Sequence, residues 1–162
     1  MAAVEYNSQN DVFTGQMFIY VNDSPLAFCS QAQLQLSQDT LDASNKMSSG
    51  WDTPLANKKS YQVTTESLLT NKTGAISYET IIDAIISGAT LTFWMGAVAT
   101  APGTTDKSAY TYTRDTTKPS FSGTLLPTEC TIKSDYGSIA SCSGTFKGVG
   151  ALTHTQAVAA GA

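Results

Sequence analysis

Two stretches with strand-like alternation flank a long polar segment in the first half of this 162-residue chain. Residues 31–36 and residues 60–68 each carry apolar or β-branched side chains at every second position, the pattern of a half-buried strand. The positions that we expect on the buried faces are Ala32, Leu34 and Leu36 in the first stretch and Tyr61, Val63 and Thr65 in the second. The chain must therefore place both stretches in a sheet and accommodate what lies between them.

The segment between the stretches, residues 39–60, has no periodicity of its own. Loops of roughly 20 residues without secondary structure are uncommon in compact domains, and they usually bind a partner or are disordered. This one carries four large apolar residues among polar ones: Leu41, Met47, Trp51 and Leu55. We therefore expect residues 39–60 to form a docking loop rather than a solvated linker.

One helix is predicted, over residues 77–88. Ser77 is a good N-cap residue, Glu79 falls in the first turn, where a carboxylate is favourable, and Gly88 suits the position just after the helix. Helical spacing predicts a buried face made of Tyr78, Ile82, Ile85, Ile86 and Ala89.

The rest of the chain reads as short strands separated by turns. The predicted strands cover residues 17–21, 91–96, 110–113, 120–126, 130–134, 139–146 and 151–155, and residues 97–108 are expected to form a surface loop. This pattern predicts a mainly β fold, a β-sandwich or half-barrel with one flanking helix. We expect one domain over residues 17–156, a flexible N-terminal arm over residues 1–16 and a mobile tail over residues 157–162.

Residues for catalysis, metal binding or cofactor binding are not found as a set. The sequence has no nucleophile elbow, zinc-protease, P-loop or dinucleotide motif. His154 is the single histidine, and Glu79 and Asp83 are expected on a solvated helix face. The glycine-rich residues 144–150 are expected to end a strand in a flexible turn rather than to bind phosphate. We predict a protein that is not an enzyme and has no cofactor.

The net charge and the spacing of the cysteines indicate which classes of partner this chain does not bind. The formal net charge is −4 and only 14% of residues are charged, which does not favour a polybasic nucleic-acid site. Cys29, Cys130 and Cys142 form no CxxC pair and are expected to be buried free thiols, with a Cys130–Cys142 disulfide as a less supported alternative. No signal sequence or stretch of about 18 apolar residues is visible, so we expect folding in the cytoplasm and no membrane partner.

The order of certain short motifs carries a family resemblance. Residues 42–51 read Asp-Ala-Ser-Asn-Lys-Met-Ser-Ser-Gly-Trp, and the strand that follows ends near Glu66. A helix, a variable insertion and closing strands with Ser122-Gly123 and Ser143-Gly144 come next. Over residues 26–156 the chain resembles the major tail proteins of long-tailed bacteriophages, the TP901-1-like tail tube proteins.

That resemblance implies a structural virion protein of the phage tail, made in the bacterial cytoplasm. Six subunits would form a ring with a continuous inner β-barrel, and rings would stack into a tube through which DNA passes without specific binding. The implied partners are other copies of the chain, the tape-measure protein and the tail terminator or tip proteins. The inter-subunit contact is carried onto the docking loop, at Leu41, Asp42, Asn45, Lys46, Met47, Trp51, Asp52 and Leu55.

A different class of function stays open at the level of sequence. A non-catalytic β-sandwich that binds a ligand or a receptor would also lack catalytic motifs. Its expected mark is an exposed aromatic cluster, for which Trp94, Tyr110 and Tyr112 are the candidates.

Overall fold

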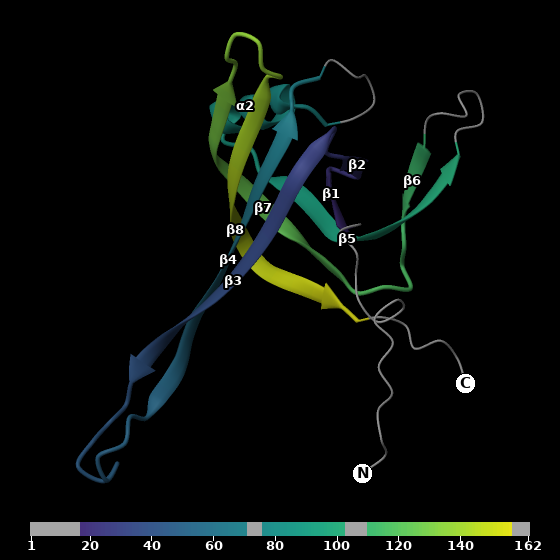
Figure 1. Cartoon of the computed structure of the whole chain (residues 1–162). Coiled ribbons are helices and arrows are strands. Elements are labelled where there is room, and N and C mark those ends of the chain that lie inside the picture. Colours follow the sequence, from purple (N-terminus) through teal and green to yellow (C-terminus); the bar gives the residue numbers. More distant parts are fainter. Residues whose placement is uncertain (1–16, 71–75, 103–109, 157–162) are drawn as a thin grey trace, which may run out of the picture.

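The computed structural model describes residues 17–70, 76–102 and 110–156, which form one mainly β body (Figure 1). The predicted N-terminal arm (1–16) and tail (157–162) lie outside the described residues. The elements are β1 (Met17–Val21), β2 (Ser24–Pro25), β3 (Cys29–Asp42), β4 (Pro54–Leu68), α2 (Tyr78–Ser87), β5 (Leu91–Pro102), β6 (Tyr110–Arg114), β7 (Ser120–Lys133) and β8 (Ser141–Thr155).

The eight strands make a sheet in the order β2-β1-β5-β7-β8-β4-β3, with β6 attached to β5. All neighbouring strands are antiparallel. The two alternating stretches of the sequence pair with each other, with Leu34 opposite Val63 and Leu36 opposite Tyr61. Tyr61, Val63 and Thr65 are buried, as their alternation predicted.

The sheet is open but strongly curled. Met17 and Phe18 on β1 line one small cleft together with residues 29–32 of β3, so two strands from opposite ends of the sheet order come close. Within the described residues, β1 and β3 are not paired by backbone hydrogen bonds. The curled sheet is therefore a half-barrel rather than a closed barrel. The mainly β fold with one flanking helix is confirmed.

The core lies inside this curl. Its fully buried large side chains come from five different elements: Ile19, Val21, Val63, Ile81, Leu125, Cys142 and Phe146. Because a buried aliphatic or aromatic side chain contributes about 1.5–3 kcal/mol, these residues hold the sheet and α2 together as one unit.

Helix α2 begins and ends where the sequence predicts, but its buried face differs. Gly88 has a left-handed φ of 69°, and its N–H bonds to the carbonyls that the helix end leaves open. Ile81 and Ala84 are the buried residues, whereas Ile85 and Ile86 are exposed, Ile86 to 79%. The predicted face was wrong because isoleucines occur on a wide arc of this short helix, so periodicity does not single out one side. No helix in the described part is long and apolar enough to cross a membrane.

Several strands are longer than predicted. β5 continues to Pro102, where a loop was expected from residue 97, and β7 and β8 each merge two predicted strands. Pro127 interrupts β7 only locally, at a register shift between Pro127 and Glu129. Proline is tolerated at such a bulge because no ladder hydrogen bond needs its missing N–H.

The glycines of residues 144–150 lie inside β8 and do not form a turn. A Cβ on Gly144 would lie 3.0 Å from the Phe146 ring, and a Cβ on Gly148 would lie 2.4 Å from the Tyr61 ring. These two glycines therefore make room for core aromatic rings, which is why the expected flexible turn is absent.

Candidate functional site: the β3–β4 arm

The expected docking loop is mostly a β-ribbon. β3 runs to Asp42 and β4 starts at Pro54, so only residues 43–53 are irregular and the expected loop over residues 39–60 was too long. β4 pairs with β8 only from Gln62 onward. Residues 37–60, here called the arm, therefore leave the body as two strands that pair only with each other, as Figure 1 shows at the lower left.

A bulge bends this ribbon near its middle. Gln38 pairs with Lys59 and Thr40 pairs with Ala56, so two residues of β4 lie opposite Asp39. Bulges increase the local twist of a ribbon and disturb its edge. An isolated two-stranded ribbon is marginally stable in water, which makes contact with a partner favourable for the arm.

The tip of the arm is organised by its own polar groups. The Ser44 N–H donates to Oδ1 of Asp42 at 2.8 Å, and the Met47 N–H donates to Oδ1 of Asn45 at 2.8 Å. The Thr53 N–H donates to the Ser44 hydroxyl at 3.1 Å and closes the loop. Hydrogen bonds from the Ser44 hydroxyl and amide lower the pKa of the Asp42 carboxyl below its ordinary value. These Asx-type contacts fix the tip without any support from the body.

Two residues with left-handed backbone turn the chain at the end of the arm. Ser49 has a φ of 51° and Gly50 a φ of 81°, and the Trp51 N–H donates to the Ser48 carbonyl at 2.9 Å. Glycine adopts such a φ readily. The turn therefore sets the direction in which Trp51 leaves the loop.

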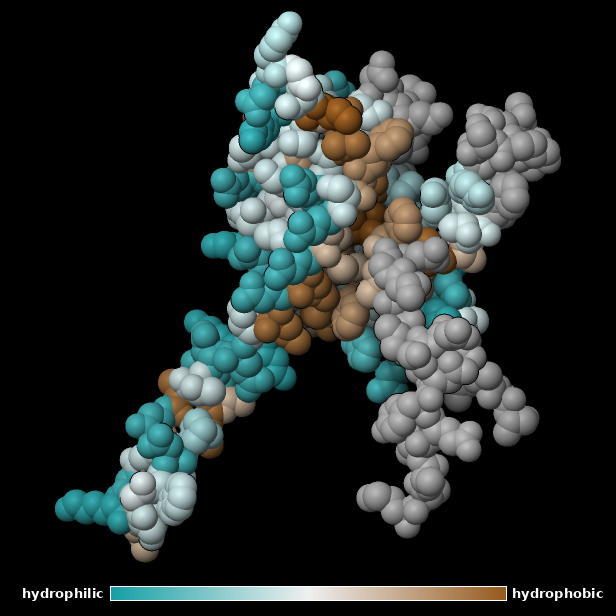
Figure 2. Space-filling view, viewed as in Figure 1, coloured by the Kyte–Doolittle hydropathy of each residue, from teal (hydrophilic) through white to brown (hydrophobic). Residues whose placement is uncertain are grey.

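The apolar side chains of the arm are exposed. Met47 is 90% exposed and Trp51 80%, and Leu41 and Leu55 lie directly opposite each other with more than half of each side chain exposed. Figure 2 shows the arm as a mostly hydrophilic projection with separate hydrophobic side chains. An ordered loop that presents an uncovered tryptophan has the residue type and setting of an interface hot spot.

The structure brings the predicted contact residues onto this one projection but gives them different roles. Asp42 and Asn45 use their side chains to shape the tip. Leu41, Met47, Trp51 and Leu55 are uncovered, and Lys46 and Asp52 are exposed beside them.

Other exposed apolar residues were not predicted, and two of them, Leu36 and Ile86, were wrongly expected on buried faces. Leu36 at the base of the arm, Phe28 before β3, Ile86 on α2 and Ile139 after β7 are all more than 60% exposed. Phe28 has a φ of 48°, a strained conformation for a non-glycine residue. For Ile86 the sequence holds a signal, because the consecutive residues Ile85 and Ile86 do not point to the same side of a helix. These residues add apolar surface outside the arm.

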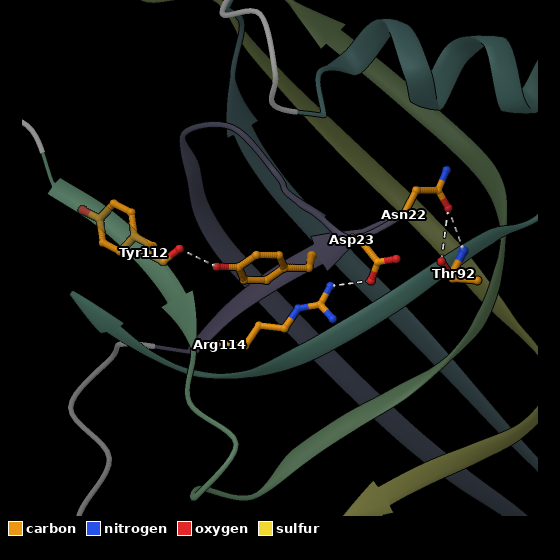
Figure 3. A network of polar contacts seen from close by, with 6 residues as sticks. Asn22, Asp23, Thr92, Tyr112 and Arg114 are labelled. Atoms are coloured by element: carbon orange, nitrogen blue, oxygen red, sulfur yellow. Dashed lines mark hydrogen bonds and ion pairs between the residues drawn. The ribbon is translucent and has the colours of Figure 1, made fainter. Parts of the chain in front are cut away.

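Two of the three aromatic residues considered for ligand binding, Trp94 and Tyr112, pack within the molecule, whereas Tyr110 is 60% exposed. Trp94 packs edge-on against Tyr20, and the Arg114 guanidinium lies over both rings at 4.7 Å from the Tyr20 centroid and 5.3 Å from the Trp94 centroid. Figure 3 shows Arg114 with its ion-pair partner Asp23. Tyr112 packs against Phe18 at 4.8 Å, and its carbonyl accepts a hydrogen bond from the Tyr20 hydroxyl. These contacts attach β6 to the body and leave no stacked platform of free rings at this place.

The cysteines are free thiols, of which only Cys142 is fully buried. The Sγ atoms of Cys130 and Cys142 lie 3.1 Å apart on neighbouring strands. Burial and the neighbouring Cys130 thiol raise the pKa of Cys142 to about 12, which keeps it protonated at neutral pH. Cys29 and Cys130 are only partly buried, which corrects part of the expectation. His154 stacks on Phe121 at 5.0 Å, and no group of acidic, cysteine or histidine residues in the described ranges could hold a metal ion.

No protein-family model matches this chain, and no curated protein sequence is significantly similar to it. Solved structures do match. The chain is similar to a component of the tail of an empty gene transfer agent particle with C6 symmetry (TM-score 0.65, 14% identity, covering 89% of this chain and 99% of that one). It is also similar to the SPP1 tail tube protein (0.59, 12%, 91% and 81%). A third match is a chain of the sheath–tube complex of the extracellular contractile injection system PVC (0.60, 14%, 96% and 100%).

These likenesses define the class of fold. Each match spans about nine-tenths or more of this chain, so the likeness concerns the fold of the chain as a whole. The chain has the fold of a tail tube protein.

Proposed function

We propose that this protein is a structural subunit of a bacteriophage tail tube and is related to the TP901-1-like major tail proteins. Copies of the chain form hexameric rings, and the rings stack into the conduit for DNA delivery. The observation that carries the proposal is the arm, an ordered projection whose large apolar side chains are more than half exposed in the single subunit. The sixfold symmetry of a similar tail supports the hexamer.

The sheet offers two free edges for ring formation. β3 is the last strand of the sheet and pairs only with β4. At the other side, β5 pairs with β7 only as far as Leu125, so among the described strands residues 126–133 of β7 pair only with β8. An unpaired strand edge is an aggregation hazard, and head-to-tail pairing around a ring removes it.

The arm makes the contact to a second copy of the chain. Trp51 and Met47 anchor it, Leu41 and Leu55 add apolar area, and Lys46 and Asp52 lie exposed beside them. Tape-measure and terminator proteins are the further partners of such a tube, and the site of action is the virion tail. We propose no catalysis and no membrane contact.

Electron microscopy of the purified chain at rising concentration tests the proposal. We expect hollow tubes or stacked rings from the unmodified chain. Trp51→Ala should stay folded, because Trp51 touches no core residue, and should need a higher concentration to polymerise, since truncating a hot spot costs about 2 kcal/mol or more in binding.

The matched control is Tyr110→Ala, which truncates an exposed aromatic residue outside the arm. It should leave polymerisation near that of the unmodified chain. A monomer at every concentration would refute the tube, whereas loss of the folded state in Trp51→Ala would show that Trp51 belongs to the core.

A further inference from the structure

Two of the three cysteines lie next to each other on neighbouring strands. Cys130 is on β7 and Cys142 is on β8, and their Sγ atoms are 3.1 Å apart. In the ladder between these strands Cys130 lies opposite Gly144 and Cys142 lies opposite Ile132, so the two thiols meet diagonally. An S–S bond is about 2 Å long, and the sulfur atoms therefore need to approach by about 1 Å to form one.

The third cysteine is too far away to compete for this pairing. Cys29 on β3 lies opposite Ser67 on β4, and Ser67 lies opposite Cys142 on β8. A whole strand thus separates Cys29 from Cys142, which is about 10 Å between Cα atoms at the usual strand spacing, and Cys130 lies one strand further away. Because a disulfide needs Cα atoms within about 7 Å, the topology allows one pairing only and leaves Cys29 as a free thiol.

The two neighbouring thiols differ in their access to solvent. Cys142 is 1% exposed, whereas Cys130 is only partly buried. Burial and the neighbouring thiol also raise the pKa of Cys142 to about 12, so this thiol is both shielded and protonated at neutral pH. The thiolate is the nucleophile in disulfide exchange. Cys130 is therefore the thiol that a dissolved oxidant reaches first, and Cys142 is placed to react second.

The pair lies where the β7–β8 ladder has little support from other strands. β5 pairs with β7 only as far as Leu125, so among the described strands residues 126–133 are held by β8 alone. Large side chains near this end of the ribbon are exposed, Ile132 to 45% and Ile139 to 75%. Segments with few buried contacts open at a lower free energy than the core does. A covalent link between Cys130 and Cys142 would hold the two strands together at this point.

We propose that Cys130 and Cys142 form a redox-dependent lock: they are two thiols in a reducing environment and a disulfide within the subunit in an oxidising one. The reducing cytoplasm keeps such thiols free, whereas disulfides persist outside the cell. For a chain that is made in a bacterium and released in a particle, the bond forms after release. This timing rests on the proposed function, but the chemistry of the pair does not.

A small disulfide such as oxidised glutathione supplies the oxidant. The Cys130 thiolate attacks one sulfur atom of this molecule, its S–S bond breaks, and one glutathione thiolate leaves. Cys142 then loses its proton and attacks the Cys130 sulfur, and the second glutathione thiolate leaves. The two cysteines together lose two electrons, which glutathione disulfide gains, and their two protons end on two molecules of reduced glutathione.

Thiol counting on the full-length chain tests the pairing. The purified chain is reduced, freed of reductant, incubated with oxidised glutathione and then unfolded in denaturant that contains N-ethylmaleimide. Its intact mass should show three alkyl groups on the reduced chain and one on the oxidised chain, because only Cys29 stays free. Peptide mapping should place the bond between Cys130 and Cys142. Three alkyl groups after oxidation, a glutathione that stays on Cys130, or a bond to Cys29 or to a second chain would each overturn the proposal.

Thermal unfolding and hydrogen exchange test whether the bond acts as a lock. A disulfide stabilises a fold mainly by constraining the unfolded chain, so the oxidised chain should have a Tm about 5 °C or more above that of the reduced chain. Dithiothreitol should restore the lower Tm. Exchange should slow at the amides of residues 126–133 and stay unchanged in β6. If the bond forms and neither the Tm nor the exchange changes, the role as a lock is wrong.

Variants separate this pair from the third thiol. Cys29→Ser should keep the Tm difference between the oxidised and the reduced chain. Cys130→Ser should form no disulfide within the chain and should lose the Tm difference, and Cys130→Ala checks the same result without an added hydroxyl. All these measurements use the folded chain below the concentration at which it polymerises. Absence of tubes would refute the proposed function and leave the lock standing, whereas absence of the bond would refute the lock alone.

Discussion

At the scale of single residues, one tyrosine shows how closely β4, β8 and β7 are packed. The Tyr61 hydroxyl donates to the Thr124 carbonyl at 2.7 Å and accepts from the Thr124 N–H at 3.2 Å. Its ring lies where side chains on Gly123 and Gly148 would be. The Tyr61 side chain of β4 thus extends over β8 and bonds to β7. Gly123 and Gly148 leave the space that its ring and hydroxyl occupy.

Gly148→Ala should destabilise the folded chain. The new Cβ would lie 2.4–2.5 Å from three Tyr61 ring atoms, and Tyr61 cannot move without losing its hydrogen bonds to Thr124. Overpacking of this kind costs about 1–3 kcal/mol of unfolding free energy. Urea denaturation measures the loss, and Ser143→Ala on the exposed face of the same strand is the control with little effect.

A double variant identifies the cause. In a Tyr61→Leu background the alanine at position 148 meets a smaller neighbour, so its added cost should shrink. An equal cost in both backgrounds would mean that the glycine is needed for the backbone of β8 and not for the tyrosine ring.

At the scale of elements, β6 is attached to the body by side chains as well as by its ladder with β5. Arg114 on β6 lies over Tyr20 and Trp94 and forms an ion pair with Asp23 at 2.8 Å (Figure 3). The Asp23 side chain is 88% exposed, so solvent screens this ion pair. The ring contacts are therefore the stronger part of the attachment.

Arg114→Ala should loosen β6 while the rest of the sheet stays folded. No residue of β6 belongs to the buried core, so the loss is local and about 1 kcal/mol for the ring contacts. Hydrogen exchange should become faster at the β6 amides and stay unchanged in β4 and β8. Asp23→Ala is the matched control and should change β6 exchange less; a larger effect than that of Arg114→Ala would show that the ion pair dominates.

Element types were predictable from sequence to different degrees. Alternation identified the buried face of β4 correctly. In β3, Ala32 and Leu34 are only half-buried and Leu36 is 63% exposed, since β3 is the last strand of the sheet and continues into the arm. The extents of β5, β7 and β8 were not predictable. Pro127 usually ends a strand, but a bulge accommodates it in β7. Glycines also usually interrupt strands, but in β8 they lie against aromatic rings that occupy the space of their missing side chains. The candidate contact residues were found by their type, but the ribbon that presents them depends on a strand pairing that continues through polar residues.

At the scale of the whole molecule, the charge balance and the sheet geometry point to the same use. The formal net charge is −4. The face of β3, β4, β8 and β7 that lies opposite the core, here called the wall face, holds two acidic residues, Glu66 and Glu129, and two basic ones, Lys133 and Lys147. The excess of negative charge therefore lies elsewhere on the chain. Neither the net charge of the chain nor the charge of the wall face favours binding to a polyanion. This charge balance supports the proposed role as a subunit of a DNA conduit.

Adding lysines to the wall face should create salt-dependent DNA binding. The variant Gln35→Lys, Thr64→Lys, Ser143→Lys places one cation on each of three strands in three different rows, so that no two face each other directly. It changes the formal net charge from −4 to −1. We expect measurable binding of a fluorescent duplex at low salt, with log affinity falling against log salt at a slope of at most about −2.7, the value for three phosphate contacts.

The control carries alanine at the same three positions and removes the polar groups without adding charge. Like the unmodified chain, it should show no salt-dependent binding to the duplex. If the unmodified chain itself bound duplex DNA with a clear salt slope, the balanced charges of the wall face would not prevent retention, and a sliding surface would have to be sought elsewhere on the molecule. If instead the lysine variant assembled into tubes that keep DNA after a low-salt wash and release it at high salt, the few charges on this face would decide between holding and passing the polymer.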